Sequence, residues 1–426
     1  VAVAALLFFL NGGLGFLYDF DLAFTDNFAR IREIFTGYYR TPANQPDLNL
    51  RFSNVIADLM IPQRALLGGW AMGIPALYLL ISSAREKSYR QTALLALWAS
   101  ALPLVHTHTF LALGLFSGGY LLGNLVEHRQ DWRGILIRAG LYLGVVLALA
   151  LPQLMGNAVK QTLEGGSLRF QFNWVNNSGG YGFKDFYFWF WVKNAGLPFI
   201  LVVCACLCAR RRGYLDIVLG MTAIYVVAET ILFQPNEYDN NKLFYIWFMF
   251  AMILAADYGS LIMQRLAGLP GRALPCGLFL WASVFSGALS LGREAVSGYQ
   301  LFSANAVAAG DWIRENTDRD DVFLTGQQHI NPVCSLAGRQ IICGSDLYVF
   351  FHGLDYAQQS ADCRHFYENP RENADVLTKY DVHYIYVSDY ERAEFDVDLD
   401  ALDETYELIY ENDDVRIYDT GWRETP

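Results

Sequence analysis

The sequence predicts an α-helical polytopic membrane protein with about nine transmembrane helices and a C-terminal soluble α/β domain. Three observations predict this fold class. Hydrophobic residues make up 54% of the 426 positions and charged residues only 17%, whereas soluble domains carry about 25% charged residues. Long apolar runs recur as far as Gly292. The sequence beyond that point is acidic and lacks such a run, so two chemically different parts share the chain.

Each predicted span approaches the roughly 20 apolar residues that are needed to cross the hydrocarbon core of a bilayer. The segments are 1–18, 62–82, 91–105, 108–126, 134–154, 188–209, 214–233, 243–263 and 273–292. The two segments that flank His106 are short, and they could instead form a re-entrant hairpin.

Basic residues gather in four short connections between these spans. They are Arg85, Lys87 and Arg90; Arg129 and Arg133; Arg210, Arg211 and Arg212; and Arg265 and Arg272. With nine spans, all four connections fall on one side, and the excess of Lys and Arg predicts that this side is cytoplasmic. Because successive spans cross the membrane in opposite directions, the loops 19–61, 155–187 and 234–242 then lie outside, together with the acidic segment. We therefore expect a multi-pass plasma-membrane protein whose C-terminal domain is extracytoplasmic.

The first residues of the chain lead to a further prediction. It starts at Val1 rather than Met, and no basic stretch precedes the first apolar run. Because a complete signal peptide has such a stretch, we expect a fragment that lacks earlier spans.

The charge balance separates a transmembrane domain over 1–292 from an acidic domain over 293–426. The first carries 21 Lys and Arg against 16 Asp and Glu, and the second carries 10 against 27. No basic stripe exists, so nucleic acid is not an expected partner. In the acidic domain, helices are predicted over 304–316, 353–367 and 371–379, and strands over 322–325, 383–387, 406–410 and 415–418.

The seven cysteines include no CxxC spacing, so a thiolate metal site has no support. The sequence leaves open whether Cys334 and Cys343 form a disulfide.

Carboxylates follow the first apolar run at Asp19 and Asp21. Two carboxylates at this spacing can hold a divalent cation such as Mg²⁺ or Mn²⁺, or one can act as a general base on a hydroxyl. The alternative interpretation is that they are interfacial acids next to the amphipathic stretch 22–39.

A basic residue, Arg64, stands at the outer start of a predicted span, with Asp58 shortly before it. An arginine at this depth must pair or reach the interface, and a lipid phosphate lies at the same depth. A structural pair with Asp58 is the alternative.

Two histidines, His106 and His108, stand between two apolar runs. They could chelate a metal or carry a proton, although no third ligand is near in sequence. Hydrogen-bonded histidines that line a polar cavity are the alternative.

The outer loop 234–242 has more polar residues than a turn needs. Asp239 and Lys242 could pair there, with Asn240 or Asn241 held against a sugar or a phosphate. Polar density of this kind at a membrane boundary indicates a binding site. The aromatic stretch 170–194, which includes Lys193, is typical of an interfacial anchor, and aromatic rings also stack on sugars.

Polar residues also mark loops of the acidic domain, at Asn331, Arg339 and His352. No nucleophile and base stand together there. We expect a loop that docks on the membrane cavity rather than a second active site.

Several motifs together resemble the GT-C superfamily of polytopic glycosyltransferases, most closely its large uncharacterised bacterial and archaeal members. The motifs are Asn11 to Phe16, Pro62-Gln63-Arg64, Pro103 to Phe110, Trp191 to Asn194, Pro235 to Leu243, Asn331-Pro332, Leu336 to Arg339 and His352-Gly353. The resemblance implies a sugar donor linked to a polyprenyl phosphate, transfer at the extracytoplasmic face, and an acid of the first outer loop as catalytic base or metal ligand.

We therefore expect a membrane enzyme that transfers a sugar from a polyprenyl-phosphate donor to a lipid, glycan or protein acceptor. Asp19 or Asp21 would deprotonate the acceptor, and Arg64 and Lys242 would neutralise the leaving phosphate. Asp239 and the two histidines would position the sugar or a divalent ion. The rival interpretations are a transporter or flippase of lipid-linked glycans and a non-catalytic scaffold subunit in contact with membrane lipids.

Overall fold

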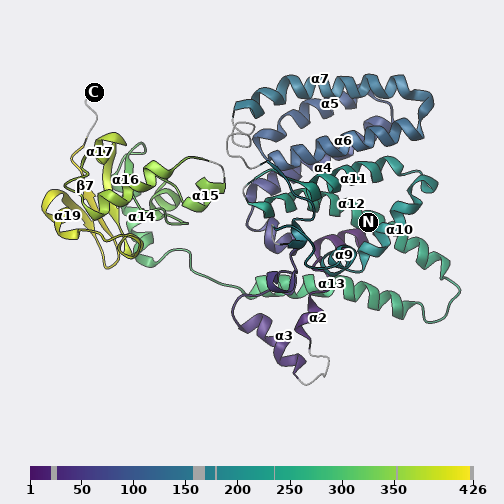
Figure 1. The fold of residues 1–426 in the computed structure, drawn as a ribbon, viewed down its shortest axis with the longest axis horizontal. Coiled ribbons are helices and arrows are strands. Elements are labelled where there is room, and N and C mark those ends of the chain that lie inside the picture. Colours follow the sequence, from purple (N-terminus) through teal and green to yellow (C-terminus); the bar gives the residue numbers. More distant parts are fainter. Residues whose placement is uncertain (21–25, 157–167, 178–179, 235, 352–353, 423–426) are drawn as a thin grey trace. The chain divides into compact units, whose positions relative to one another are not determined.

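The computed structural model describes residues 1–20, 26–156, 168–177, 180–234, 236–351 and 354–422 (Figure 1). They divide into two compact units, Val1–Ser297 and Gly298–Pro426. The first unit ends slightly beyond the predicted boundary because its last helix continues to Val296.

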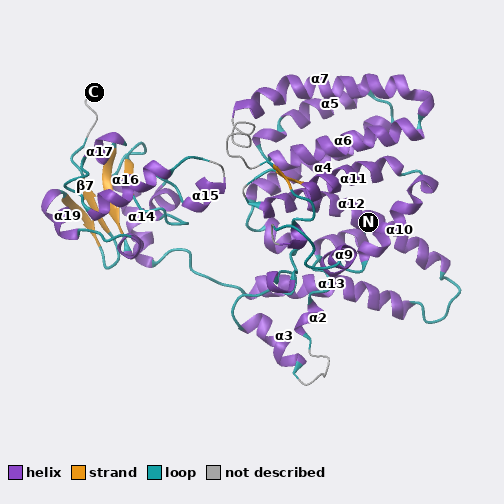
Figure 2. Cartoon of the chain, in the orientation of Figure 1, coloured by secondary structure: helices purple, strands orange, loops and turns teal. Residues whose placement is uncertain are grey.

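Helices dominate the first unit, as Figure 2 shows. They are α1 (Ala2–Phe9), α2 (Phe16–Asp19), α3 (Asn27–Thr36), α4 (Arg64–Arg85), α5 (Tyr89–Ser100), α6 (Thr107–Glu127), α7 (Trp132–Gly156), α9 (Tyr187–Ala195), α10 (Pro198–Arg212), α11 (Leu215–Thr230), α12 (Asn241–Arg265) and α13 (Ala273–Val296). Two short strands, β1 (Arg169–Phe170) and β2 (Ile231–Leu232), pair antiparallel.

Five stretches of helix in the described residues are long and apolar enough to cross a membrane: Arg64–Arg85, Thr107–Glu127, Arg129–Met155, Glu237–Arg265 and Ala273–Val296. A sixth span results if α9 and α10 count as one, although they meet at an angle of 115°. These apolar helices mark a membrane protein. The predicted count of about nine is not confirmed.

The remaining predicted spans are broken or short for local reasons. Residues 1–18 form the separate helices α1 and α2 because Asn11, Gly12 and Gly13 interrupt the helix. Gly13 adopts a positive φ of 60°. The segment 91–105 contributes only the 12-residue helix α5, which rises about 18 Å. The segment 214–233 forms the 16-residue helix α11.

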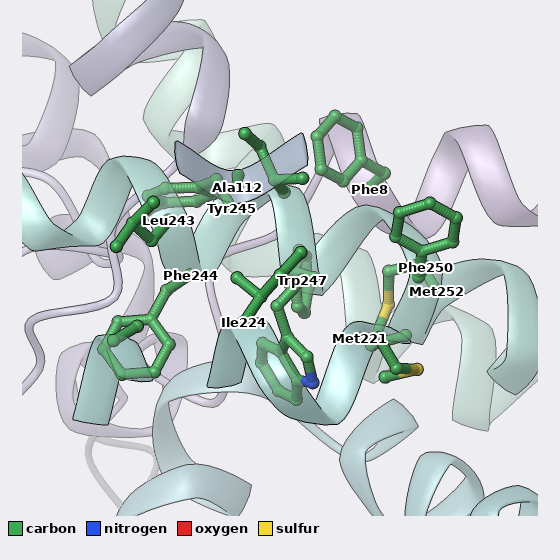
Figure 3. Packing of buried hydrophobic residues seen from close by; sticks show 14 of the residues in the cluster. Phe8, Ala112, Met221, Ile224, Leu243, Phe244, Tyr245, Trp247, Phe250 and Met252 are labelled. Carbon is green, nitrogen blue, oxygen red and sulfur yellow. The ribbon is translucent and has the colours of Figure 1, made fainter. Parts of the chain in front are cut away.

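Helix α12 lies at the centre of the first unit's core. Its first half is buried on every side, as expected for a helix that is hydrophobic all round. Figure 3 shows its side chains packed among those of α1, α6 and α11. The labelled residues are Phe8, Ala112, Met221, Ile224, Leu243, Phe244, Tyr245, Trp247, Phe250 and Met252.

Buried amides tie several loops of the first unit together. The Asn194 side chain accepts hydrogen bonds from the backbone N–H groups of Arg51 (2.7 Å) and Phe52 (3.0 Å). It also donates to the carbonyl oxygen of Asn49 at 3.1 Å. Asn11 likewise donates to the Ser53 carbonyl oxygen at 2.7 Å. Buried backbone groups outside helices need such partners, so these amides hold the loop around residues 49–55 in one conformation.

The second unit is an α/β domain, as predicted. Its helices are α14 (Ala304–Asn316), α15 (Asp346–Phe351), α16 (Ala357–Glu368), α17 (Asp375–Lys379), α18 (Asp389–Glu394) and α19 (Leu399–Thr405). Its strands are β3 (Val322–Leu324), β4 (Gln340–Ile341), β5 (Val382–Val387), β6 (Glu407–Glu411) and β7 (Arg416–Asp419). The sheet order is β4-β3-β5-β7-β6. Strand β3 runs parallel to β4 and β5, and the β6–β7 hairpin is antiparallel.

Candidate functional site

The N-terminal ends of α4, α6 and α12 meet at one end of the first unit. Gly69 of α4 lies against the ring of His106, which caps α6, and Gly73 lies against Thr109. A Cβ atom at either glycine would overlap these side chains. The two glycines therefore allow α4 to approach the start of α6 closely.

His106 is held by the first turn of α6. Its Nδ1 lies 2.8 Å from the Thr109 hydroxyl and accepts the Thr109 backbone N–H at 3.3 Å. Burial lowers the pKa of His106 to about 4, and the positive charge of Lys242 lowers it further. The imidazole is therefore neutral at pH 7.

His108 lies beside His106, with 5.5 Å between the ring centroids. It is buried, and its Nε2 has no hydrogen-bond partner in the described structure. A buried polar atom without a partner is costly. His108 therefore carries a buried polar atom that no described residue satisfies.

Lys242 and Asp239 form an ion pair of 2.8 Å, as the sequence predicted, and both side chains are largely buried. Asn241 is buried, and its Oδ1 has no hydrogen-bond partner among the described residues. Asn240 instead donates to the carbonyl oxygens of Ala228 and Ile231. Asn240 thus fixes the loop, whereas Asn241 and Lys242 have groups to offer a ligand.

A narrow apolar crevice adjoins this cluster. It runs between α1, α4, α6 and α12, and its lining includes Phe8, Trp70, Ile74, Thr109 and Tyr245. Thr109 also contacts His106, so the crevice reaches the polar cluster. Ile74 is half exposed. The cluster therefore has a narrow apolar crevice as its neighbour.

Asp19 is buried and already has partners for both carboxylate oxygens. Arg40 forms an ion pair with Oδ1, and Gln45 donates to Oδ2 at 3.3 Å. Burial raises the pKa of Asp19, and Arg40 and Gln45 oppose the rise. The predicted catalytic role of Asp19 would require these bonds to rearrange. Asp21 lies outside the described residues.

Lys193 is also engaged within the protein. Its ammonium pairs with Asp185 and donates to the Leu48 carbonyl oxygen at 2.8 Å. Asn49 donates to the same carboxylate at 2.8 Å. Lys193 therefore joins α9 to two loops, and these contacts give it a structural role.

Asp58 is a candidate that the sequence suggested only as a partner for Arg64. No ion pair joins the two, and Arg64 is exposed. Asp58 Oδ2 is buried and has no hydrogen-bond partner in the described part of the chain. Burial raises the pKa of Asp58 to about 6, with a smaller contribution from the charge of Glu294, and a hydrogen bond from Ser53 opposes the rise.

Ser53 connects Asp58 to the crevice. Its side chain bonds to Asp58, and its carbonyl oxygen accepts the Tyr245 hydroxyl. Tyr245 lines the crevice and lies one helical turn after Lys242. No sequence motif marks Asp58, because its burial comes from contacts with distant segments.

No cluster of metal ligands stands out among the described residues. They contain no group of three or more His, Cys, Asp and Glu side chains that could hold a metal ion. The ammonium of Lys242 acts on both histidines, and a cation at that position would be repelled. Asp19 is paired with Arg40. The divalent cation stays a prediction.

In the second unit, Asn331 and Arg339 support local backbone. Asn331 donates to the Thr325 hydroxyl at 3.0 Å and accepts the Val333 N–H at 2.9 Å. Arg339 donates to the carbonyl oxygens of Ala337 (2.8 Å) and Thr317 (2.8 Å). These bonds explain both residues structurally. His352 lies outside the described residues.

No family model and no curated protein match the chain. Among solved structures, it is similar to an Archaeoglobus fulgidus oligosaccharyltransferase tethered to an acceptor peptide with the NVT sequon. The identity is 11% and the TM-score 0.46, over 99% of this chain and 61% of that chain.

A second similar structure is the archaeal oligosaccharyltransferase AglB from Archaeoglobus fulgidus, in complex with an inhibitory peptide and a dolichol-phosphate. The identity is 13% and the TM-score 0.40, over 95% of this chain and 58% of that chain. The chain thus spans about three fifths of the length of these proteins. Both TM-scores are below 0.5, so neither similarity supports a chemical role for this chain. The chemistry proposed for the chain depends on its own residues.

Proposed function

We propose that this protein is a membrane glycosyltransferase that takes a sugar from a polyprenyl-phosphate donor at the extracytoplasmic face. The acceptor would be a lipid, a glycan or a protein. The observation that carries the proposal is the cationic end formed by α4, α6 and α12, next to an apolar crevice. A phosphate would bind at this end, and the hydrocarbon chain attached to it would lie along the neighbouring crevice.

The electrostatics of this end favour a phosphate. The N-terminus of each helix carries partial positive charge from its backbone dipoles. Lys242, paired with Asp239, lies in the first turn of α12, and Arg64 adds a positive charge at the first position of α4. The neutral ring of His106 can donate a hydrogen bond without carrying a charge.

In the proposed reaction, negative charge develops on the donor phosphate as the bond from the sugar to the phosphate oxygen breaks. Lys242 is held in place by Asp239, so it stabilises this charge without reorganising. His108 and Asn241 would orient the donor through polar atoms that have no other partner in the described structure. The phosphate leaves as an anion and needs no proton from the protein.

A carboxylate must accept the proton of the acceptor hydroxyl or amide. Among the described acids of the outer loops, Asp58 has the features of a general base. Its pKa is raised to about 6 and one oxygen has no partner. A base with a pKa near the working pH is the most effective one. Asp19 and Asp21 remain alternatives.

The test is turnover by the purified protein in lipid nanodiscs with a radiolabelled polyprenyl-phosphate sugar. Release of polyprenyl phosphate with label transfer to an acceptor is expected. Lys242→Met should lower kcat by roughly 10²- to 10³-fold, and Arg64→Ala should mainly raise KM because Arg64 is exposed.

Arg265→Met is the matched control, since it removes a charge from the last turn of the same helix. Full turnover by both the Lys242 and the Arg64 variants would reject the phosphate site. Movement of intact donor across the bilayer without cleavage would indicate a flippase instead.

A further inference from the structure

A second cavity lies at the opposite end of the same helices and plays no part in the proposed transfer. Its volume is about 670 Å³, and it is bounded by the last turns of α4, α6 and α10 and the first turns of α7 and α11. The His106 cluster lies at the N-terminal ends of α4 and α6. The two sites are therefore separated by the length of these helices.

Four basic side chains line this cavity: Arg85, Lys87, Arg138 and Arg210. Two of them are engaged by one acid. Asp131 pairs with Lys87 at 3.2 Å and with Arg138 at 3.1 Å.

The other two acids in the lining are held by the protein as well. Glu127 accepts the backbone N–H of Leu215 at 3.1 Å. Asp216 accepts the Ile217 N–H at 2.7 Å and lies 3.4 Å from the Asn124 amide. Both carboxylates therefore stabilise the start of α11.

The side chains of Arg85 and Arg210 are the two basic groups of the lining that can bind a ligand. Neither forms an ion pair within the part of the chain that the structure describes. They come from different helices, α4 and α10, and line one cavity. A guanidinium group presents a planar set of donors that matches phosphate oxygens.

Two apolar residues of the lining favour a lipid over a soluble anion. Val126 and Ile135 line the cavity together with the charged groups; Val126 is exposed, whereas Ile135 is buried. A headgroup bound between the arginines would have the exposed apolar side chain of Val126, on α6, beside its chains. Basic pockets between membrane helices on the cytoplasmic side bind anionic headgroups in this way.

We propose that this cavity binds the phosphate headgroup of an anionic phospholipid, with Arg85 and Arg210 as its ligands. The site is separate from the donor site, so it stands whether or not the protein transfers a sugar.

The experiment compares the protein in nanodiscs of phosphatidylcholine alone with nanodiscs that also contain phosphatidylglycerol. Native mass spectrometry counts retained phosphatidylglycerol, and a thermal melt reports stability. Phosphatidylglycerol should be retained and should raise the Tm by at least about 2 °C. Arg85→Gln with Arg210→Gln should lower its apparent affinity at least about tenfold.

Arg265→Gln with Arg272→Gln is the matched control, because it removes the same charge from the loop between α12 and α13. The control should keep full retention. Equal loss in both double variants would overturn the proposal, since only general surface charge would then be involved. Binding of inorganic phosphate without any preference for phosphatidylglycerol would overturn it too. A circular dichroism spectrum equal to that of the unaltered protein shows that each variant is folded.

Discussion

Asp58 is a residue whose chemistry depends on its surroundings. In sequence it is one of many acids of the loop 19–61. In the structure one of its oxygens is buried without a partner, and burial raises its pKa to about 6. The predicted acid of the same loop, Asp19, is paired with Arg40.

Replacing Asp58 tests its proposed role as a base. The ionised form accepts the proton, so turnover of the unaltered protein should rise with pH through about 6 and level off above it. Asp58→Asn should lower kcat by roughly 10²- to 10⁴-fold. Asp47→Asn is a control acid of the same loop. An unchanged pH profile in the Asp58 variant would rule out this role.

The raised pKa of Asp58 also predicts how the stability of the folded protein depends on pH. The pKa of Asp58 is raised from 3.8 to about 6 in the folded protein, so the folded state binds more protons than the unfolded state between these values. Its stability contribution is therefore lost as the pH rises through this window. Asp58→Asn should be at least as stable as the unaltered protein above pH 6 in a melt, and a less stable variant at that pH would contradict the burial of the charge.

At the scale of elements, local sequence predicts where long helices lie and misses where they break. Helices α4, α6, α7, α12 and α13 follow predicted apolar runs. The run 188–209 is equally apolar, yet it bends by 115° between α9 and α10. Gly196, with a φ of 82°, provides that bend. A hydrophobic run indicates that a segment is buried, but it does not indicate the direction in which the helix continues. It therefore does not reveal a bend.

Gly13 gives a test of such a break. Its φ is positive, and a Cβ atom there would overlap the carbonyl oxygen of Lys193, which accepts the Leu14 N–H at 2.8 Å. Gly13→Ala should therefore destabilise the protein by more than about 1 kcal/mol, seen as a lower Tm in detergent. Gly114→Ala, where a Cβ would meet nothing within 4 Å, should leave the Tm unchanged or slightly higher. Equal melting of both variants would show that the break tolerates side chains.

At the scale of the whole molecule, the orientation in the membrane is still a prediction. It depends on the agreement of four basic loops. The cysteines offer a direct test, because all seven are free and Cys334 is the one whose side chain is exposed. Cys334 and Cys343 are not bonded to each other in the structure.

A membrane-impermeant maleimide should label Cys334 in intact cells, because the second unit is predicted to lie outside. Cys334→Ser should abolish the labelling. Cys208→Ser, two residues before the basic end of α10, should leave it unchanged. Labelling of Cys334 only after permeabilisation would reverse the predicted orientation.

The sequence by itself determined that the first unit is mainly helical and apolar, that the second is an acidic α/β unit, and that Asp239 pairs with Lys242; the predicted count of about nine spans is not confirmed. Each of these depends on composition or on residues close together in the chain, where spacing fixes geometry. Only the tertiary structure decided the rest. It gave Asp19 and Lys193 partners, left Asp58 without one for its buried oxygen, and brought His106 under the influence of Lys242. These outcomes depend on desolvation and on contacts between segments far apart in sequence, which no local pattern encodes.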